Sequence, residues 1–160
     1  MKTAQNHLAE KLVRVLKEKG MTVSTAESCT GGLIAKLITD VSGSSAVFSG
    51  SCVSYTNDVK MRVLGVPREI IDRETEVSAA CAMAMADGAR RLFQTDIAVS
   101  TTGFAGPTGG TERDPVGTVY IGLATQSGTT CVRFSADPKC SRDEIRTRAA
   151  MRALEIVLEG

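Results

Sequence analysis

The chain has 160 residues, 42% of them hydrophobic and 23% charged, with a formal net charge of +1, which predicts one soluble domain over residues 1–160. The near-zero charge, the lack of a Lys/Arg run and the absence of Trp argue against nucleic acid as a partner. No apolar run approaches the ~20 residues that span a bilayer, and the start MKTAQNHLAEKL is not a signal peptide, so we expect a cytoplasmic protein without membrane association.

The first half of the chain alternates helix-forming and strand-forming patterns. Leu8, Leu12 and Leu16 recur at helical spacing, and Gly20 marks the end of that helix. The following segments are assigned from β-branched runs, renewed helical spacing and glycine or proline breaks. In order, we expect a helix at 5–19, a strand at 21–28, a helix at 31–39, a strand at 46–56, a helix at 57–66 capped by Asn57 or Asp58, and a short helix at 67–74.

The second half contains a small-residue helix, a buried strand, a hairpin and a last helix. Ser78 and Ser141 are the expected caps of the two helices, and Met83 and Met85 are expected in the core. Strands that alternate with helices and end in a hairpin predict an α/β layered domain with a mixed sheet. In order, we expect a helix at 79–93, a strand at 96–102, a long loop at 103–115, strands at 116–126 and 129–136 around a turn at 127–129, and a helix at 141–159.

The cysteines and the single histidine restrict the possible chemistry. Five cysteines stand at positions 29, 52, 81, 131 and 140 without a CxxC pair, which is typical of free thiols in a reducing cytosol. His7 is the only histidine and lies in the first predicted helix, so neither a Ser-His-Asp triad nor a zinc site is favoured. We expect no metal and no cofactor, and a nucleophile in this chain needs a base other than histidine.

The segment AESCTGG joins a predicted strand to a predicted helix, a place where ligands collect in α/β domains. Its backbone N–H groups at 29–32 are expected to hold an anion at the helix N-terminus, or to stabilise an oxyanion formed when Ser28 attacks a carbonyl. The plain alternative is a helix cap followed by Gly31 and Gly32 for close packing. Cys29 is the competing nucleophile, because a thiol at a helix N-terminus is readily activated.

A second glycine-rich segment, GFAGPTGG at 103–110, follows the predicted buried strand and is flanked by Thr102 and Thr111. Loops of this length inside a compact domain are usually functional or disordered, and disorder is not expected directly after a core strand. Two Gly/Thr-rich loops that follow two strands of one sheet are therefore expected to face one cleft.

The segment YTNDVK supplies a possible base. Tyr55 ends a predicted strand, and Lys60 lies in the first turn of the next predicted helix. A lysine serves as a general base when burial or a nearby cation lowers its pKa, and a tyrosine beside it can relay a proton. The alternatives are a solvated surface lysine and a half-buried strand aromatic.

Several motifs together resemble the CinA carboxy-terminal domain family: TAESCTGGLIAKLITDVSGSSAVF, YTNDVK, TGFAGPTGG with DPVGTVYIGLA, and RDEIRTRAAMRAL. The resemblance runs from about residue 6 to residue 158. It implies a three-layer α/β/α sandwich that hydrolyses the carboxamide of nicotinamide mononucleotide to nicotinate mononucleotide and ammonia, a reaction of pyridine nucleotide salvage. It also implies that Ser28 is the nucleophile and that Lys60 and Tyr55 are its partners.

Two segments depart from the family's pattern: Cys140-Ser141-Arg142 stands where Gly-Asp-Arg is usual, and Glu76 stands where a small residue is usual. The expected partner is a small-molecule nucleotide. Arg142 and Arg146 lie one helical turn apart and can point the same way, so we expect one of them to contact its phosphate. The expected substrate-binding residues are Cys29, Thr30, Gly31, Gly32, Thr102, Gly106, Gly109, Gly110, Arg142 and Arg146.

Two other classes of function stay open. A module that grips a nucleotide phosphate without turnover needs the glycines but has no use for a deprotonated Lys60. An oligomerisation domain would use the glycine loops only for packing. The small-residue helix at 79–90 suits a helix interface, and we expect a homo-oligomer.

Overall fold

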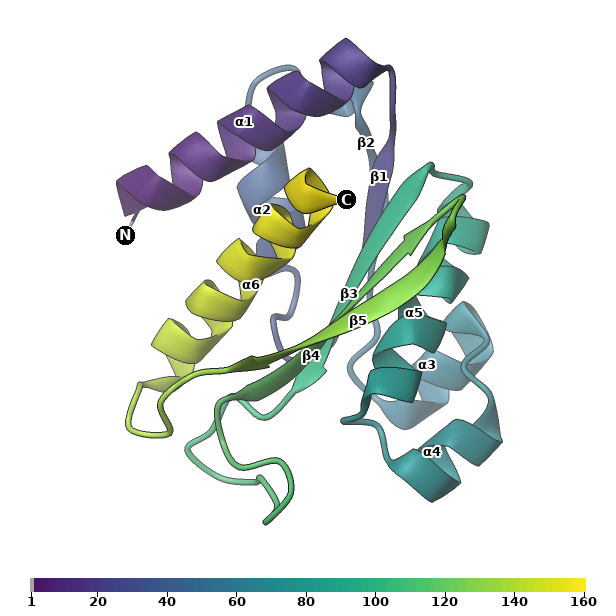
Figure 1. Ribbon diagram of the computed structural model, residues 1–160, viewed down its shortest axis with the longest axis vertical. Helices are drawn as coiled ribbons and strands as arrows, with labels where there is room; N and C mark the ends of the chain where they lie inside the picture. Colours follow the sequence, from purple (N-terminus) through teal and green to yellow (C-terminus); the bar gives the residue numbers. More distant parts are fainter. Residues whose placement is uncertain (1) are drawn as a thin grey trace.

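A computed structural model of the protein describes residues 2–160 and contains a five-stranded sheet between two layers of helices (Figure 1). The strands are β1 (Val23–Glu27), β2 (Phe48–Val53), β3 (Ile97–Gly103), β4 (Thr118–Thr125) and β5 (Gly128–Ser135). Their order is β2-β1-β3-β4-β5, with β1 parallel to β2 and β3, and β4 antiparallel to β3 and β5. The predicted α/β/α sandwich with a mixed sheet is therefore confirmed.

The helices divide between the two faces of the sheet. One face is covered by α1 (Lys2–Lys19), α2 (Leu33–Thr39) and α6 (Arg142–Glu159), which contact one another (Figure 1). The other face is covered by α3 (Asn57–Leu64), α4 (Arg68–Glu74) and α5 (Ala79–Phe93). A single 3₁₀ turn at Ser44–Ala46 precedes β2.

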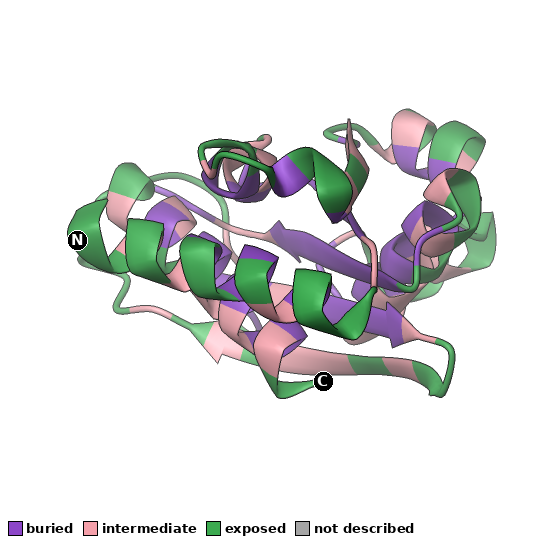
Figure 2. Cartoon of the chain, turned by 90° about the horizontal axis from the view of Figure 1, so that it is seen from above, coloured by how far each residue is buried: buried purple, intermediate pink, exposed green. Residues whose placement is uncertain are grey.

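The core lies on both faces of the central strands. Every residue of β1 is buried, and so are all residues of β3 except its last, whereas no residue of β5, at the sheet edge, is buried (Figure 2). Parallel strands covered on both faces are expected to be apolar throughout. Their polar exceptions, among them Ser24, Thr25 and Glu27, therefore need partners inside the protein.

Helix α3 packs closely against α5. A Cβ atom at Gly88 would lie 2.0 Å from the carbonyl oxygen of Leu64, so only glycine lets α5 approach the end of α3 this closely. The small residues that suggested an interface between copies, such as Ala82 and Ala86, are buried in the chain's own core. The interface role expected for this helix is therefore wrong for its small-residue face.

Some element boundaries differ from the predicted ones. Helix α2 begins at Leu33 because Gly31 and Gly32 have left-handed backbone φ values of +59° and +98°. The cap of α3 is Thr56, whose hydroxyl accepts the N–H of Val59 at 3.3 Å, and not Asn57 or Asp58. The hairpin turn lies at 126–127, one residue earlier than predicted. The predicted caps Ser78 and Ser141 and the burial of Met85 are confirmed, whereas Met83 is half-buried.

Candidate active site

A cavity of about 360 Å³ opens at the carboxyl ends of the three parallel strands. Ser28 directly follows β1, Tyr55 follows β2, and Thr102 lies near the end of β3, so the parallel pairing brings three distant segments together. The cavity is lined by Ser28, Cys29, Tyr55, Thr56, Asn57, Lys60, Glu76, Val77, Thr102, Gly103, Phe104, Ala105, Gly106, Thr108 and Arg142.

Lys60 and Ser28 are in direct contact. Lys60 is 1% exposed, and its Nζ lies 3.1 Å from Ser28 Oγ and 3.2 Å from the carbonyl oxygen of Tyr55. Within residues 2–160, no carboxylate lies within ion-pair distance of this amine. Burial lowers the pKa of Lys60, against smaller opposing effects of Cys81 and Glu76. A lysine in this setting can lose its proton more easily than one in water.

Ser28 sits in a tight turn that directs its neighbours. Its N–H donates to the carbonyl oxygen of Thr101 at 3.0 Å, and its own carbonyl accepts the N–H of Gly31 at 3.0 Å. The N–H groups of Cys29 and Thr30 donate to no group within the described part of the chain. Because Cys29 also lines the cavity, its N–H is a candidate donor to an oxyanion formed at Ser28.

Glu27 changes the interpretation of the first glycine loop. It is 0% exposed, and its carboxylate accepts the N–H groups of Ile34 at 2.9 Å and Ala35 at 3.0 Å. The same carboxylate accepts the hydroxyl of Thr30 at 2.7 Å. The N-terminus of α2 thus already holds a negative charge. The N–H groups of Ile34 and Ala35 are therefore not available to a ligand, whereas among the donors expected to hold an anion or an oxyanion at 29–32, those of Cys29 and Thr30 have no acceptor within the described residues.

The second glycine loop meets the cavity through its first part. Gly106 lines the cavity, and its carbonyl oxygen accepts Nη1 of Arg142 at 2.7 Å. Gly109 and Gly110 lie outside the lining, and both have left-handed backbone. The Thr102 hydroxyl lines the cavity but donates to the carbonyl oxygen of Glu76 at 2.6 Å.

Arg142 and Arg146 of α6 have different environments. Arg142 lines the cavity, and its Nη2 donates to the hydroxyl of Tyr55 at 3.1 Å. Tyr55 is 59% exposed, and its hydroxyl contacts Arg142 and not the Ser28–Lys60 pair. Arg146 lies outside the lining and donates to the carbonyl oxygens of Cys29 and Thr30, each at 3.1 Å. Arg146 therefore fixes the first loop and does not face the cavity.

Cys29 is poorly suited to be the nucleophile. Burial raises the pKa of its thiol to about 12, and the nearby Glu27 adds to this effect. At neutral pH the side chain is a protonated thiol, which is a weak nucleophile. Thr30, Gly31 and Gly32 do not line the cavity, so their part is to shape the turn that presents Ser28 and Cys29.

Four residues of the site or its support were not assigned a functional role from the sequence. Glu27, Asn57 and Phe104 lie inside the quoted motifs, and Glu76 was noted only as a departure from the family's pattern. Residues 2–160 contain no group of three or more His, Cys, Asp or Glu side chains arranged to hold a metal ion. None of the helices in that range has the length and apolar character to cross a bilayer.

Comparisons with known proteins identify the family of this chain and several relatives. Residues 5–160 match the model of the CinA C-terminal domain. A CinA-like protein of Geobacter sulfurreducens is 48% identical over 152 residues, which are 94% of this chain and 36% of that protein. A CinA-like protein of Dictyoglomus thermophilum is 45% identical over 158 residues, 98% of this chain and 38% of that protein. The chain spans little more than a third of the length of these curated relatives.

Solved structures of competence/damage-inducible proteins have the same fold as this chain. The competence/damage inducible protein CihA from Agrobacterium tumefaciens has a TM-score of 0.94 at 38% identity, covering 98% of this chain and 94% of that one. The competence damage-inducible protein A (ComA) from Klebsiella pneumoniae has a TM-score of 0.92 at 30% identity, covering 97% of this chain and 95% of that one.

Proposed function

Because the chain belongs to the CinA C-terminal domain family, we propose that it hydrolyses the carboxamide of nicotinamide mononucleotide to nicotinate mononucleotide and ammonia. The observation that carries this proposal is the contact of 3.1 Å between the buried Nζ of Lys60 and Ser28 Oγ, at the wall of a cavity of about 360 Å³. A cavity of this volume is of the size that binds small ligands.

The first half of the reaction forms an ester on Ser28. Neutral Lys60 accepts the hydroxyl proton of Ser28 as Oγ attacks the amide carbon. The N–H of Cys29 stabilises the oxyanion of the tetrahedral intermediate. The C–N bond then breaks, the Lys60 ammonium gives its proton to the leaving nitrogen, and ammonia departs.

The second half restores the serine. Water attacks the acyl carbon, and Lys60 again accepts a proton and returns it to Ser28 Oγ as the ester bond breaks. The product carries a carboxylate where the substrate carried an amide. Arg142, at the cavity wall between Tyr55 and Gly106, supplies the cation for the phosphate of the mononucleotide.

The test is a product assay on the purified chain. Incubation with nicotinamide mononucleotide should yield ammonia and nicotinate mononucleotide in equal amounts, detected by a coupled ammonia assay and by chromatography. Ligand binding without either product would favour the alternative function, a nucleotide-phosphate-binding module without turnover. Absence of both binding and product would remove the nucleotide from consideration altogether.

A further inference from the structure

Glu76 brings a negative charge to the proposed active site. It lines the cavity with Ser28 and Lys60 and is only partly exposed. Within residues 2–160, its carboxylate makes no ion pair and accepts no hydrogen bond; only its backbone carbonyl is used, by the Thr102 hydroxyl. A partly exposed carboxylate at the cavity wall without a protein partner can receive a cationic group of a ligand.

The position of this carboxylate relative to the other charges is informative. Glu76 lines the same cavity as Ser28 and Lys60, its backbone carbonyl accepts the Thr102 hydroxyl, and its carboxylate acts electrostatically on Lys60 and Cys81. Arg142 holds the opposite charge and is anchored to Tyr55 and Gly106. Among the described residues, Glu76 and Arg142 form no ion pair with each other, so the cavity wall presents one carboxylate and one guanidinium to a ligand.

The proposed substrate has matching charges. The ring of nicotinamide mononucleotide is a pyridinium, whose positive nitrogen stands meta to the carboxamide, and its phosphate lies beyond the ribose. When the amide carbon reaches Ser28 Oγ, the cationic ring must lie within a ring's width of it. The ring is then on the side of the cavity that carries Glu76, and the phosphate extends away from it.

We infer that Glu76 is a specificity residue that selects a cationic, pyridinium-type nucleotide over a neutral one by placing its carboxylate beside the ring. This inference rests on the proposed function. It also gives Glu76 a second effect, because the product gains a carboxylate close to Glu76, and repulsion between the two like charges promotes product release.

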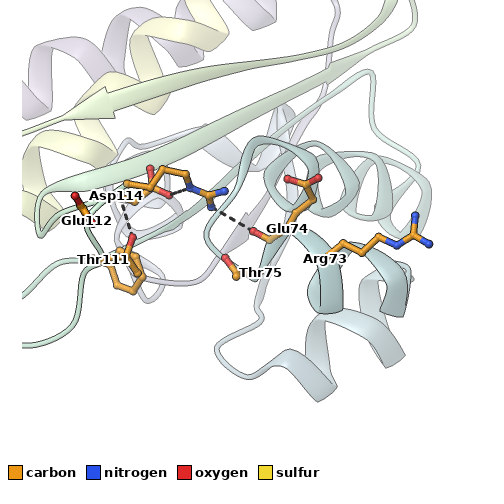
Figure 3. A pocket seen from close by; sticks show the side chains of 8 residues that line it. Arg73, Glu74, Thr75, Thr111, Glu112 and Asp114 are labelled. Atoms are coloured by element: carbon orange, nitrogen blue, oxygen red, sulfur yellow. Dashed lines mark hydrogen bonds and ion pairs between the residues drawn. The ribbon is translucent and has the colours of Figure 1, made fainter.

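A neighbouring hollow supplies a matched control. A second cavity of about 580 Å³ shares Phe104 with the first and is lined by Arg73, Glu74, Thr75 and the 111–114 segment. Figure 3 shows Glu74 and Thr75 on one side of this hollow and Thr111 and Asp114 on the other. Glu74→Gln removes the same charge two residues from Glu76, in a side chain that does not line the catalytic cavity.

The test compares two ligands that differ in ring charge. Reduced nicotinamide mononucleotide has the same amide, ribose and phosphate, but its dihydropyridine ring is neutral. Calorimetric Kd values for both ligands are measured on Ser28→Ala protein, which prevents turnover, alone and combined with Glu76→Gln, Glu76→Asp or Glu74→Gln. We expect a preference for the oxidised ligand that falls roughly tenfold in Glu76→Gln, is largely kept in Glu76→Asp, and is unchanged in Glu74→Gln.

Other outcomes overturn the inference. If the parent protein shows no preference, or if Glu76→Gln weakens both ligands equally, the carboxylate does not sense ring charge. Failure of the proposed function would be seen separately, as an absence of ammonia release by the protein that retains Ser28. A second readout is the ratio of the product inhibition constant to the substrate Kd. Substrate and product both carry the pyridinium ring, so only the new carboxylate distinguishes them, and this ratio should fall by a few-fold in Glu76→Gln and stay unchanged in Glu74→Gln.

Discussion

Two charged side chains of this protein are equally hidden from water but have opposite surroundings. Asp114 and Lys60 are each 1% exposed. Asp114 accepts hydrogen bonds from Tyr120 at 2.7 Å, Arg113 at 2.8 Å and Arg133 at 3.3 Å. Lys60 has only neutral partners, the hydroxyl of Ser28 and the carbonyl of Tyr55. The same degree of burial therefore leaves one charge compensated and the other not.

The compensated charge holds a loop in place. Burial alone would raise the pKa of Asp114, but hydrogen bonds from Tyr120 and Arg113 outweigh it and keep this pKa below its usual range. Arg113 also donates to the carbonyl oxygens of Glu74 and Val77, each at 3.3 Å, which fastens the second glycine loop to the segment that carries Glu76. The uncompensated amine of Lys60 has no such structural role, and a base needs this freedom to lose its proton.

The largest expected effect is that of Ser28→Ala. Without Oγ no ester forms, so ammonia release should fall to the uncatalysed background while Kd for the mononucleotide changes little. The control is Ser54→Ala, which removes a buried hydroxyl that has no hydrogen-bond partner and does not line the cavity. Normal turnover by Ser28→Ala would contradict the proposal, because the Ser28 hydroxyl that contacts Lys60 would then have no role in the reaction.

The second-largest loss of activity is expected from substitutions of Lys60. Lys60→Met keeps roughly the length of the side chain but removes the amine. Lys60→Arg keeps a positive charge, but the guanidinium does not lose its proton near neutral pH. Both should lower kcat at least ~100-fold, the scale of a lost general base. Lys60→Met should keep or raise the free energy of unfolding, since it removes an uncompensated buried amine. Lys36→Arg, on an exposed lysine of α2, is the control.

The pH profile gives the same amine a second test. The base is active when neutral, so kcat/KM should rise with pH through the pKa of Lys60. Because burial lowers this pKa, the midpoint should lie below the ordinary lysine value of about 10.4. The rising limb should disappear in Lys60→Arg enzyme. A midpoint at the ordinary value would mean that burial does not activate the amine.

Replacement of Arg142, the exposed cation at the cavity wall, should have a smaller effect on activity. Arg142→Ala removes the charge proposed to hold the phosphate and should raise KM for the mononucleotide roughly 10- to 100-fold. The riboside, which lacks the phosphate, should be affected much less by the same change. Equal use of the mononucleotide and the riboside by the unaltered protein would mean that no phosphate site exists.

Asp114→Asn tests how much the ion pairs of the buried Asp114 contribute to stability. The amide loses the negative charge that Arg113 and Arg133 share, and we expect the free energy of unfolding to fall by about 1–3 kcal/mol in denaturant titrations. Both arginines are more than a third exposed, so water limits the loss. The contribution is full above the ordinary aspartate pKa of about 3.9 and is lost as pH falls through the lower folded value, so the difference should shrink in acid.

Much of the fold could be predicted because each element carries a local signal. Periodicity gave the order of helices and strands, and Ser78 and Ser141 cap their helices as expected. The start of α2 was predicted at residue 31, which is too early. Gly31 and Gly32 have left-handed φ values before the helix begins, and the sequence does not specify the φ that a glycine adopts.

The site was only partly predictable for a related reason. Ser28, Lys60 and Arg142 come together because loops that follow parallel strands meet at one edge of the sheet. Glu27 was not assigned a role, and Arg146 was expected among the substrate-binding residues, because their actual partners are backbone groups of the first turn of α2 and of the 29–30 segment, which only the fold brings near. The partners of Asp114 include Arg133, which only the pairing of β4 with β5 brings near.

The smallest expected effect is that of Cys29→Ala. This thiol lies beside Ser28 at the cavity, so it is the residue that a rival mechanism would use. Burial raises the pKa of the thiol to about 12, which keeps it protonated at neutral pH. Its proposed contribution is the backbone N–H, which alanine retains, so kcat should stay within about twofold of the unaltered enzyme. An inactive Cys29→Ala protein beside an active Ser28→Ala protein would transfer the nucleophile's role to the thiol, and Lys60 would then serve a different atom.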